Sequence, residues 1–475
     1  MLTPMVDRRD LQQRLDDLAH QYRVPGAAAG VLVGGRVEVV ATGIAKLGTS
    51  VPVTTDSVFL LASLTKVWTA TLVLQLVDEG LVDPSLPVNH YLDPSLRLAN
   101  EEVARTVTVG QLLSHSGGFF GDAAEPNIRS DDAVEKIVDS YRDLVQLHRP
   151  GALFSYSNSG YNVLGRLVEC VTGSTWDDAL RTRLIEPLGL GSTSTLPEET
   201  MTRPLVVGHV PAAPGSHDLA PVSTWLDPRT SGPCGGTLAA TPADLLAFAR
   251  HHLENGLAPS GARLMSAETT RSMREPHVVQ PDPSRGPAWG WGWSIEHLEP
   301  RVVGHIGSTC GQQSRLVLAP DHGVAICVMA SGDVQGMGDK LVSELLEQLV
   351  GVGLPATPDP VEADVDVTPY VGRFRMSDEA TIDVRAEASG LVASFTTSGR
   401  WADFHGDFST PMTYAGGTTF LMTMPPVTDP VAATFLWEDG ADGPATHLAS
   451  QMRVAPRSEA FTRSWPRPGS SPDSV

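Results

Sequence analysis

The chain has 475 residues, of which 41% are hydrophobic and 19% charged. This composition is typical of a folded protein, and the length is too great for one ordinary domain. With 55 acidic against 34 basic residues, the formal net charge is −21. Such a surface repels phosphate backbones and anionic lipids, which argues against nucleic-acid or membrane partners.

The N-terminal residues 1–24 mix charged side chains with Leu11, Leu15 and Leu18. This pattern predicts an amphipathic opening helix, because a secretory signal needs a basic start followed by an unbroken apolar run. No segment approaches the ~20 apolar residues of a membrane span. We therefore expect a cytoplasmic protein.

The cysteines and histidines give no sign of a metal site. None of the four cysteines belongs to a CxxC pair, and the sequence contains no HExxH motif or clustered His/Cys set. In the cytosol such cysteines are expected to be reduced and structural. We predict no metal and no other cofactor.

The first half of the chain predicts a hairpin followed by helices. Residues 31–33 and 37–41 alternate around Gly34-Gly35, which is typical of a β-hairpin. Residues 63–79 are apolar on nearly every face, so this helix should be buried inside the protein. Further helices are expected at 109–113, 131–146, 160–172, 242–254 and 338–349.

Short apolar segments later in the chain predict antiparallel strands at 289–295, 301–306, 314–319 and 324–330. Trp289, Trp291 and Trp293 should share one face of the first strand, as core or pocket wall. Because a hairpin opens this region and a helix closes it, we expect a sheet built from both ends. The intervening helices would form a second lobe, with the 63–79 helix between lobe and sheet.

The C-terminal part predicts a separate domain. Residues 353–364 have the Pro-rich composition of a linker. Beyond them, apolar alternation without helical periodicity predicts strands at 372–375, 381–385, 391–396, 418–424, 432–437 and 447–454. These strands predict a small antiparallel barrel over 365–457. Residues 458–475 are predicted to be a disordered tail. The main domain would then span 1–352.

The strongest local motif is Ser63-Leu64-Thr65-Lys66, at the start of the apolar helix. Residues three apart share a helical face, so the hydroxyl and the amine can touch. Desolvation in an apolar helix disfavours the ammonium form and makes the lysine a useful base. The alternative is a surface lysine whose amine reaches solvent. The chain has only four lysines, so one inside its most apolar helix favours the functional interpretation.

Two further motifs are weaker when taken alone. Tyr156-Ser157-Asn158 offers a phenol that can pass protons and a carboxamide that can hold an amide or the lysine, although it also suits a loop that caps a helix. The segment 304–308, Gly-His-Ile-Gly-Ser, is expected to end a strand and begin a turn. A glycine in a strand lets a substrate approach closely, and backbone amides there and at Ser63 can form an oxyanion hole.

Together, SxxK, YxN and HxG in this order resemble the signature of the serine β-lactamase and penicillin-binding-protein superfamily, over about residues 11–350. The branch most similar is that of class C β-lactamases, esterases and D-peptidases. The resemblance implies an α/β (α+β) fold of the β-lactamase/transpeptidase type, with an antiparallel sheet flanked by helices and an all-helical lobe. The roles it implies are Ser63 as nucleophile, Lys66 and Tyr156 as base and acid, Asn158 and His305 as assisting residues, and the amides of Ser63 and Ser308 as oxyanion donors.

One departure narrows the choice within the superfamily. β-Lactamases and many cell-wall peptidases carry lysine where this chain has His305, and histidine is mostly neutral near pH 7. The C-terminal barrel, which opens with Tyr370-Val371-Gly372-Arg373-Phe374, resembles a lipocalin-like module attached to some relatives. A cytosolic enzyme of this layout looks like the penicillin-binding-protein-type thioesterases, which act on nonribosomal peptide assembly lines.

That resemblance implies a partner, a peptidyl carrier protein of a nonribosomal peptide synthetase that presents a peptidyl thioester. The product would be a head-to-tail macrolactam, often closed at a C-terminal D-residue. Gly235 would leave room for the D side chain, Gly307 would let the substrate approach the strand, and Arg453 would hold the peptide's terminus. Gly235 and Arg453 also have ordinary interpretations, as a turn glycine and a solvated arginine.

Two alternatives remain open. The first is a cytosolic D-stereospecific peptidase or esterase that uses the same serine with water as acceptor. The second is a non-catalytic binding or sensor protein that keeps the fold, which the intact set of three motifs disfavours.

Overall fold

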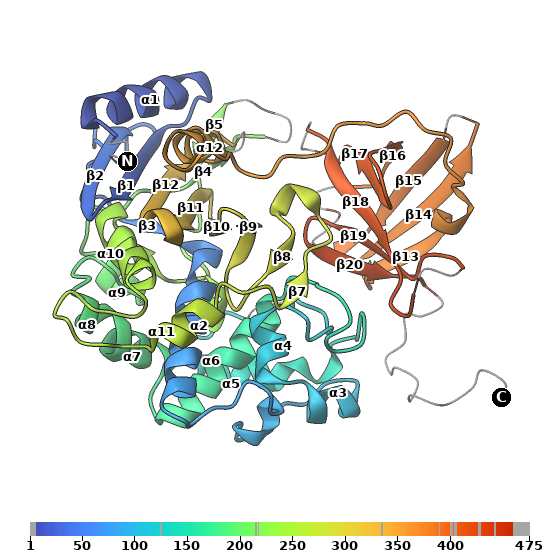
Figure 1. The fold of residues 1–475 in the computed structure, drawn as a ribbon, viewed down its shortest axis with the longest axis horizontal. Helices are drawn as coiled ribbons and strands as arrows, with labels where there is room; N and C mark the ends of the chain where they lie inside the picture. Colours follow the sequence, from blue (N-terminus) through green and yellow to red (C-terminus); the bar gives the residue numbers. More distant parts are fainter. Residues whose placement is uncertain are drawn as a thin grey trace.

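The computed structural model describes residues 6–458 except 124–125, 214–215, 217, 334–335, 389, 400–401, 403–405, 426–428 and 441–442. The predicted tail, residues 458–475, lies outside the described residues apart from Ser458. Two eight-stranded antiparallel sheets organise the chain. One belongs to the β-lactamase-like part, and the other lies beside it in the orange-to-red C-terminal domain (Figure 1).

The first sheet is built from both ends of its region, as predicted. Its strand order is β2-β1-β12-β11-β10-β9-β8-β7, and β1 pairs directly with β12 from Gly26↔Ser331 to Val33↔Val324. Both strands are buried along their whole length, because helices cover both faces of the sheet. The strands are β1 (Gly26–Val33), β2 (Arg36–Gly43), β7 (Val278–Val279), β8 (Ala288–Trp289), β9 (Ser294–His297), β10 (Val302–Thr309), β11 (Gln312–Ala319) and β12 (Val324–Ser331).

Helices from opposite ends of this part cover one face of the sheet. The helices α1 (Arg8–Gln21) and α12 (Met337–Val350) lie together on it (Figure 1), and their leucines form one apolar cluster with β1 and β12. The other face packs against α2, α10 and the helical lobe in a second, larger cluster. These helices are α2 (Thr65–Asp78), α3 (Glu101–Thr106), α4 (Val109–Leu113), α5 (Ala133–Asp139), α6 (Asn158–Thr172), α7 (Trp176–Leu180), α8 (Glu186–Leu188), α9 (Pro197–Thr200), α10 (Pro242–Leu253) and α11 (Ala267–Ser272).

Helix α2 confirms the prediction of a buried central helix. Every residue from Thr65 to Leu76 is buried, since sheet and helical lobe enclose it on all sides. Ser63 lies just before the α-helix, in a 3₁₀ turn over Ala62–Leu64. Ala62 has φ of 50°, a left-handed conformation that costs a non-glycine residue energy and is found most often at functional sites.

The C-terminal sheet runs in sequence order from β13 to β20 and nearly closes into a barrel. Its first and last strands meet, because Phe374 bridges Arg457 and the amide of Ser458 donates to the Arg373 carbonyl at 2.8 Å. Phe374, Phe420 and Phe435 fill its interior. The strands are β13 (Gly372–Ser377), β14 (Ala380–Glu387), β15 (Gly390–Thr397), β16 (Phe408–Tyr414), β17 (Thr419–Met422), β18 (Val431–Leu436), β19 (His447–Ser450) and β20 (Arg453–Pro456). This fits the expected lipocalin-like domain.

The structure corrects four predicted elements. The helix expected at 131–146 is only α5, which passes into a 3₁₀ turn at Ser140. The three tryptophans do not share a strand, because β8 ends at Trp289 and β9 begins at Ser294. The strand expected at 301–306 continues as β10 to Thr309, so Gly307 and Ser308 lie in a strand rather than a turn.

The fourth correction concerns the end of the barrel. The segment 447–454 was predicted to be one strand, but it folds into two, β19 and β20. Gln451 and Met452 join them with φ of 47° and 66°, a turn in the left-handed region that the alternating apolar pattern does not reveal. Strand β16 was also missed, because Pro411 and its polar neighbours interrupt the pattern.

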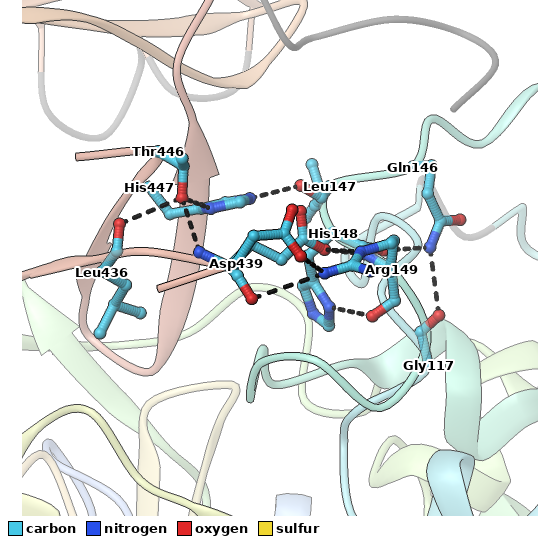
Figure 2. Close-up of polar contacts among 10 residues, drawn as sticks. Gly117, Gln146, Leu147, His148, Arg149, Leu436, Asp439, Thr446 and His447 are labelled. Atoms are coloured by element: carbon cyan, nitrogen blue, oxygen red, sulfur yellow. Dashed lines mark hydrogen bonds and ion pairs between the residues drawn. The ribbon is translucent and has the colours of Figure 1, made fainter. Parts of the chain in front are cut away.

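The turn between β18 and β19 docks on the loop that precedes Tyr156 (Figure 2). His447 Nε2 lies 2.9 Å from the Leu147 carbonyl oxygen, and Arg149 pairs with Glu438 and Asp439. Leu147 also packs against Ala449 and Val454 in a small apolar cluster. The interface thus combines apolar packing with a buried histidine and an ion pair.

This interface predicts acid sensitivity. Burial lowers the pKa of His447 to about 4, whereas an unfolded histidine titrates near 6.5. Because the unfolded chain then binds more protons than the folded one, stability is lost as pH falls from about 6.5 to about 4, by roughly 3 kcal/mol for a shift of this size. The His447→Gln variant keeps a donor for the Leu147 carbonyl but cannot titrate. We expect the melting temperature of the wild type to fall by roughly 3–6 °C more than that of the variant between about pH 6.5 and about pH 4.

The measurement is thermal unfolding followed by circular dichroism at several pH values. His322→Gln is the matched control, because His322 is exposed and its replacement should leave the pH dependence unchanged. Identical pH dependence of H447Q and wild type would contradict the prediction.

Candidate active site

Ser63 and Lys66 lie against each other, as their spacing predicts. The Lys66 Nζ is 3.2 Å from the Ser63 Oγ. Lys66 is fully buried, whereas Ser63 remains half-buried. A hydroxyl open to one side and a buried amine on the other is the arrangement that nucleophilic catalysis needs.

The surroundings of Lys66 suit an amine that exchanges protons. Its Nζ donates to the Cys234 carbonyl oxygen and lies 4.8 Å from the centre of the Tyr156 ring and 5.8 Å from that of Tyr161. Among the described residues, no carboxylate lies within ion-pair distance of it. The Cys234 carbonyl engages one N–H of the amine, so that a lone pair, in the deprotonated form that catalysis requires, would be directed to the Ser63 hydroxyl.

Tyr156 reaches this cluster from the loop before α6, where Ser157 caps the helix by accepting from the Gly160 amide at 2.9 Å. Tyr156 is 4% exposed. Its ring contacts those of His115 and Trp289, with centroids 4.2 and 5.8 Å away. The predicted set of hydroxyl, amine and phenol is thus brought together in space.

His115 holds the loop that carries Tyr156 in place. It has φ of 57°, and its Nδ1 accepts a hydrogen bond from the Ser157 amide at 3.0 Å. Burial, with the charge of Lys66 nearby, lowers its pKa well below the ordinary value. The neutral ring packs against that of Tyr156, with an angle of 32° between the two planes.

Asn158 is the first residue of α6 and is half-buried. Its Nδ2 donates to Asp122 Oδ1 at 2.9 Å. The same carboxylate accepts two hydrogen bonds from Arg453, at 2.6 and 2.9 Å. Arg453 is therefore an ion-paired arginine rather than a solvated one, with one edge of its guanidinium engaged by Asp122.

His305 lies on β10, 3% exposed, with its ring 5.4 Å from that of Trp289 and 6.2 Å from that of Tyr156. Its Nδ1 lies 2.7 Å from the Ile306 carbonyl oxygen, which can only accept, so the proton is on Nδ1 and Nε2 is a free acceptor. Burial, with Lys66 nearby, lowers its pKa to about 3. The imidazole ring is therefore neutral near pH 7, unlike the lysine that β-lactamases carry at this position.

Beyond Gly304, strand β10 has a strand partner on one side only within the described part of the chain. Strand β9 pairs with Val302–Gly304, whereas β11 pairs as far as Thr309. The free edge over 305–309 offers backbone groups to which an extended chain can add. Ser308 is exposed on this edge.

Two glycines pack β10 and the 234–236 segment against the Ser63 turn. An added Cβ on Gly307 would meet the Leu61 carbonyl oxygen at 2.1 Å. One on Gly235, whose φ is 136°, would lie 2.8 Å from the Ser63 backbone nitrogen. Both glycines therefore have a packing reason that is independent of any substrate.

Three residues of this site were not found from the sequence. Met452 accepts the Tyr156 amide with its carbonyl oxygen at 2.8 Å, and Asp122 and Cys234 bind Asn158 and Lys66. Met452 and Cys234 act through their backbone carbonyls, which every residue has, so the sequence does not reveal these contacts. Asp122 lies close to the Gly117-Gly118 pair in sequence, but nothing in its local pattern distinguishes it from other aspartates.

The sheet, the enclosed α2 and the Ser63–Lys66–Tyr156 cluster define a protein of the serine β-lactamase and penicillin-binding-protein class. The family model described as Beta-lactamase matches residues 11–350. The chain therefore belongs to this family of serine hydrolases. In accord with this, it is 40% identical over 374 residues to "Penicillin-binding protein 4" of Amycolatopsis lactamdurans, covering 78% of this chain and 97% of the relative.

Solved structures extend the similarity to both domains. The crystal structure of SurE matches with a TM-score of 0.76 and 26% identity, covering 95% of this chain and 99% of that one. The octameric penicillin-binding protein homologue from Pyrococcus abyssi matches with a TM-score of 0.62 and 19% identity, covering 95% of this chain and all of that one, which supports the fold alone. In the described part of this chain, no helix has the length and apolarity to cross a bilayer.

Proposed function

We propose that this protein is a trans-acting thioesterase and cyclase that releases a carrier-bound nonribosomal peptide as a head-to-tail macrolactam, at a C-terminal D-residue. The observation that carries the proposal is the junction between the Ser63–Lys66–Tyr156 cluster and the β19–β20 turn, where Met452 binds the Tyr156 backbone. A second domain at the nucleophile suits a long substrate and helps to exclude water, which favours attack by an amine.

In the proposed reaction, the Ser63 Oγ attacks the thioester carbonyl carbon while its proton passes to Lys66. The amides of Ser63 and Ser308 stabilise the oxyanion. When the intermediate collapses, the carbon–sulfur bond breaks and the carrier thiol leaves with a proton delivered through Tyr156. The peptide's own N-terminal amine then attacks the ester, loses a proton to the same relay, and Ser63 recovers its hydroxyl.

The charges around the site support a thioester substrate. β-Lactams and cell-wall peptides carry a carboxylate beside the reacting bond, whereas a peptidyl thioester has none there. His305 is neutral, and the Arg453 cation is paired with Asp122. A site whose cations are buried or paired fits a substrate whose reacting end is uncharged.

The similarity to SurE spans both domains, and one matching structure, with a TM-score of 0.74 and 26% identity, is of SurE with D-Leu. This supports a substrate ending in a D-residue. We assign Gly307 to the approach of the peptide along β10, Gly235 to space for the D side chain, and Arg453 to the peptide's terminus, through its Nη1, which in this structure donates to the Gln451 carbonyl at 3.4 Å. The proposed partner is a peptidyl carrier protein.

The second candidate is a D-stereospecific peptidase or esterase with water as acceptor. It is favoured by a 26% identity over 365 residues to the "Unguisins hydrolase ungD'" of Aspergillus campestris, covering 72% of this chain and 66% of that protein. The same acyl-enzyme serves both reactions, and only the acceptor differs.

The test uses a peptidyl N-acetylcysteamine thioester ending in a D-residue, analysed by mass spectrometry. We expect a product lighter by one water than the linear acid, formed at least about tenfold faster than from the L-ending thioester. Ser63→Ala should form neither product above background. Linear acid as the main product would support the hydrolase, and full turnover by S63A would overturn both candidates.

A further inference from the structure

Asp122 joins the two domains at the candidate active site. It lies in the segment between α4 and α5, and its carboxylate accepts from Arg453 of β20 through Nε at 2.6 Å and through Nη2 at 2.9 Å. The same group accepts from Asn158 Nδ2 at 2.9 Å. One carboxylate therefore connects the last strand of the barrel with the first residue of α6.

This connection fixes the orientation of the Asn158 carboxamide. A carboxylate can only accept hydrogen bonds, so the nitrogen of the amide must face Asp122 and the oxygen must face away. The Asn158 Oδ1 is then the atom available to accept from Lys66 or from a substrate N–H. Without the carboxylate, the amide could turn and present a donor instead.

The charge of Asp122 is maintained in the fold. Burial raises its pKa, but the Arg453 guanidinium and the charge of Lys66 outweigh burial and hold the pKa below the ordinary value. The two side chains are 26% and 24% exposed, so their bidentate pair is partly shielded from water. Pairs of this geometry are among the stronger hydrogen-bonded contacts in proteins.

The backbone around Asp122 is packed onto the same loop. The preceding Gly121 carbonyl accepts from the Ser159 amide at 2.9 Å. A Cβ added to Gly121 would lie 2.6 Å from the Tyr156 carbonyl oxygen. On the other side, the Arg453 guanidinium carbon is 5.1 Å from the Tyr156 ring centre. A shift of Asp122 would therefore move Arg453 and change the surroundings of the Tyr156 phenol.

We propose that Asp122 is a positioning residue that orients Asn158 and anchors Arg453 of the C-terminal domain beside Tyr156. The role rests on the serine acyl-transfer chemistry proposed above, but it does not depend on cyclisation. It assigns the barrel a part in organising the nucleophile's surroundings, in addition to any contact with substrate.

The test compares the rate at which a fluorophosphonate probe labels Ser63 in the full-length wild type and in Asp122→Asn. This substitution keeps the volume and removes the charge. We expect labelling to slow about 10- to 100-fold, since a displacement of about 1 Å at a reacting group can cost 10²-fold. Asp439→Asn is the matched control, because Asp439 is also paired with an arginine across the domain interface but contacts no residue of the site. It should stay within about twofold of wild type.

Coupling to Asn158 separates positioning from general stability. In an Asn158→Ala background, D122N should lower the labelling rate by no more than about threefold further. Should D122N fold poorly, Asp122→Glu provides the second variant: the ion pair with Arg453 is retained, the Asn158 amide is displaced, and labelling should still slow several-fold. The inference would be overturned if folded D122N or D122E were labelled at the wild-type rate. It would also be overturned if D439N lost as much labelling rate as D122N, or if the effects of D122N and N158A on the rate were additive. If the proposed cyclisation were wrong, the wild-type enzyme would instead release linear acid from the peptidyl thioester, whatever the labelling rates of these variants.

Discussion

Lys66→Met is expected to lower the rate of Ser63 acylation by about three to four orders of magnitude. The amine is the basic group that lies 3.2 Å from the Ser63 hydroxyl, and methionine keeps an apolar stem without it. A hydroxyl without a base is a weak nucleophile, and removal of one member of such a unit costs nearly as much as removal of the whole. The measurement is the rate at which the fluorophosphonate probe phosphonylates Ser63, a reaction that needs the same activated hydroxyl.

The control for this variant is Lys340→Met. Lys340 is 53% exposed and pairs with Glu344 on α12, which packs on the face of the sheet opposite to α2, so its loss should leave the labelling rate unchanged. Both variants should remain folded by circular dichroism. A folded K66M protein that keeps more than about a tenth of the wild-type rate would remove the lysine from the mechanism.

Gly235→Ala is expected to destabilise the protein by about 2–4 kcal/mol and to slow turnover of both D- and L-ending substrates, the D-ending one more strongly. The new methyl group would lie 2.6 Å from the Ala62 carbonyl carbon and 2.8 Å from the Ser63 nitrogen, and φ at this position is 136°. Overpacking and backbone strain each cost about 1–3 kcal/mol. Relief of the clash would displace the Ser63 amide and weaken the oxyanion hole.

Gly191→Ala is the matched control, since no atom lies within 4 Å of a Cβ added there and its backbone is not left-handed. Its melting temperature and turnover should match those of the wild type. If G235A instead kept the wild-type melting temperature and lost only the D-ending substrate, Gly235 would provide space for the substrate side chain but would not be needed for packing against the nucleophile.

Which parts of the site were predictable depended on how far apart their residues lie in sequence. Ser63 and Lys66 were found because a helix places residues three apart side by side. Tyr156 and His305 were found by resemblance, since their motifs alone also fit an ordinary loop and an ordinary strand. Asp122 and Arg453 are 331 residues apart, and no local pattern indicates such a contact.

The errors in the fold have the same origin. Residues 447–454 alternate like a single strand, but the sharp turn at Gln451–Met452 is stabilised by what surrounds it, including the bond from the Tyr156 amide to Met452. The end of β10 was placed too early because Gly307 looks like a turn residue. In the sheet, pairing with β11 and the close approach of Leu61 make a glycine suitable inside the strand.

By itself, the sequence determined the two-domain organisation, the enclosed α2 and the contact between Ser63 and Lys66, because apolar periodicity and helical spacing act over a few residues. Only the tertiary structure decided that the barrel's last turn lies against Tyr156, that Asp122 holds Asn158 and Arg453, and that burial lowers the pKa of His305 to about 3. These features depend on burial and on contacts between distant segments, which exist only once the chain has packed.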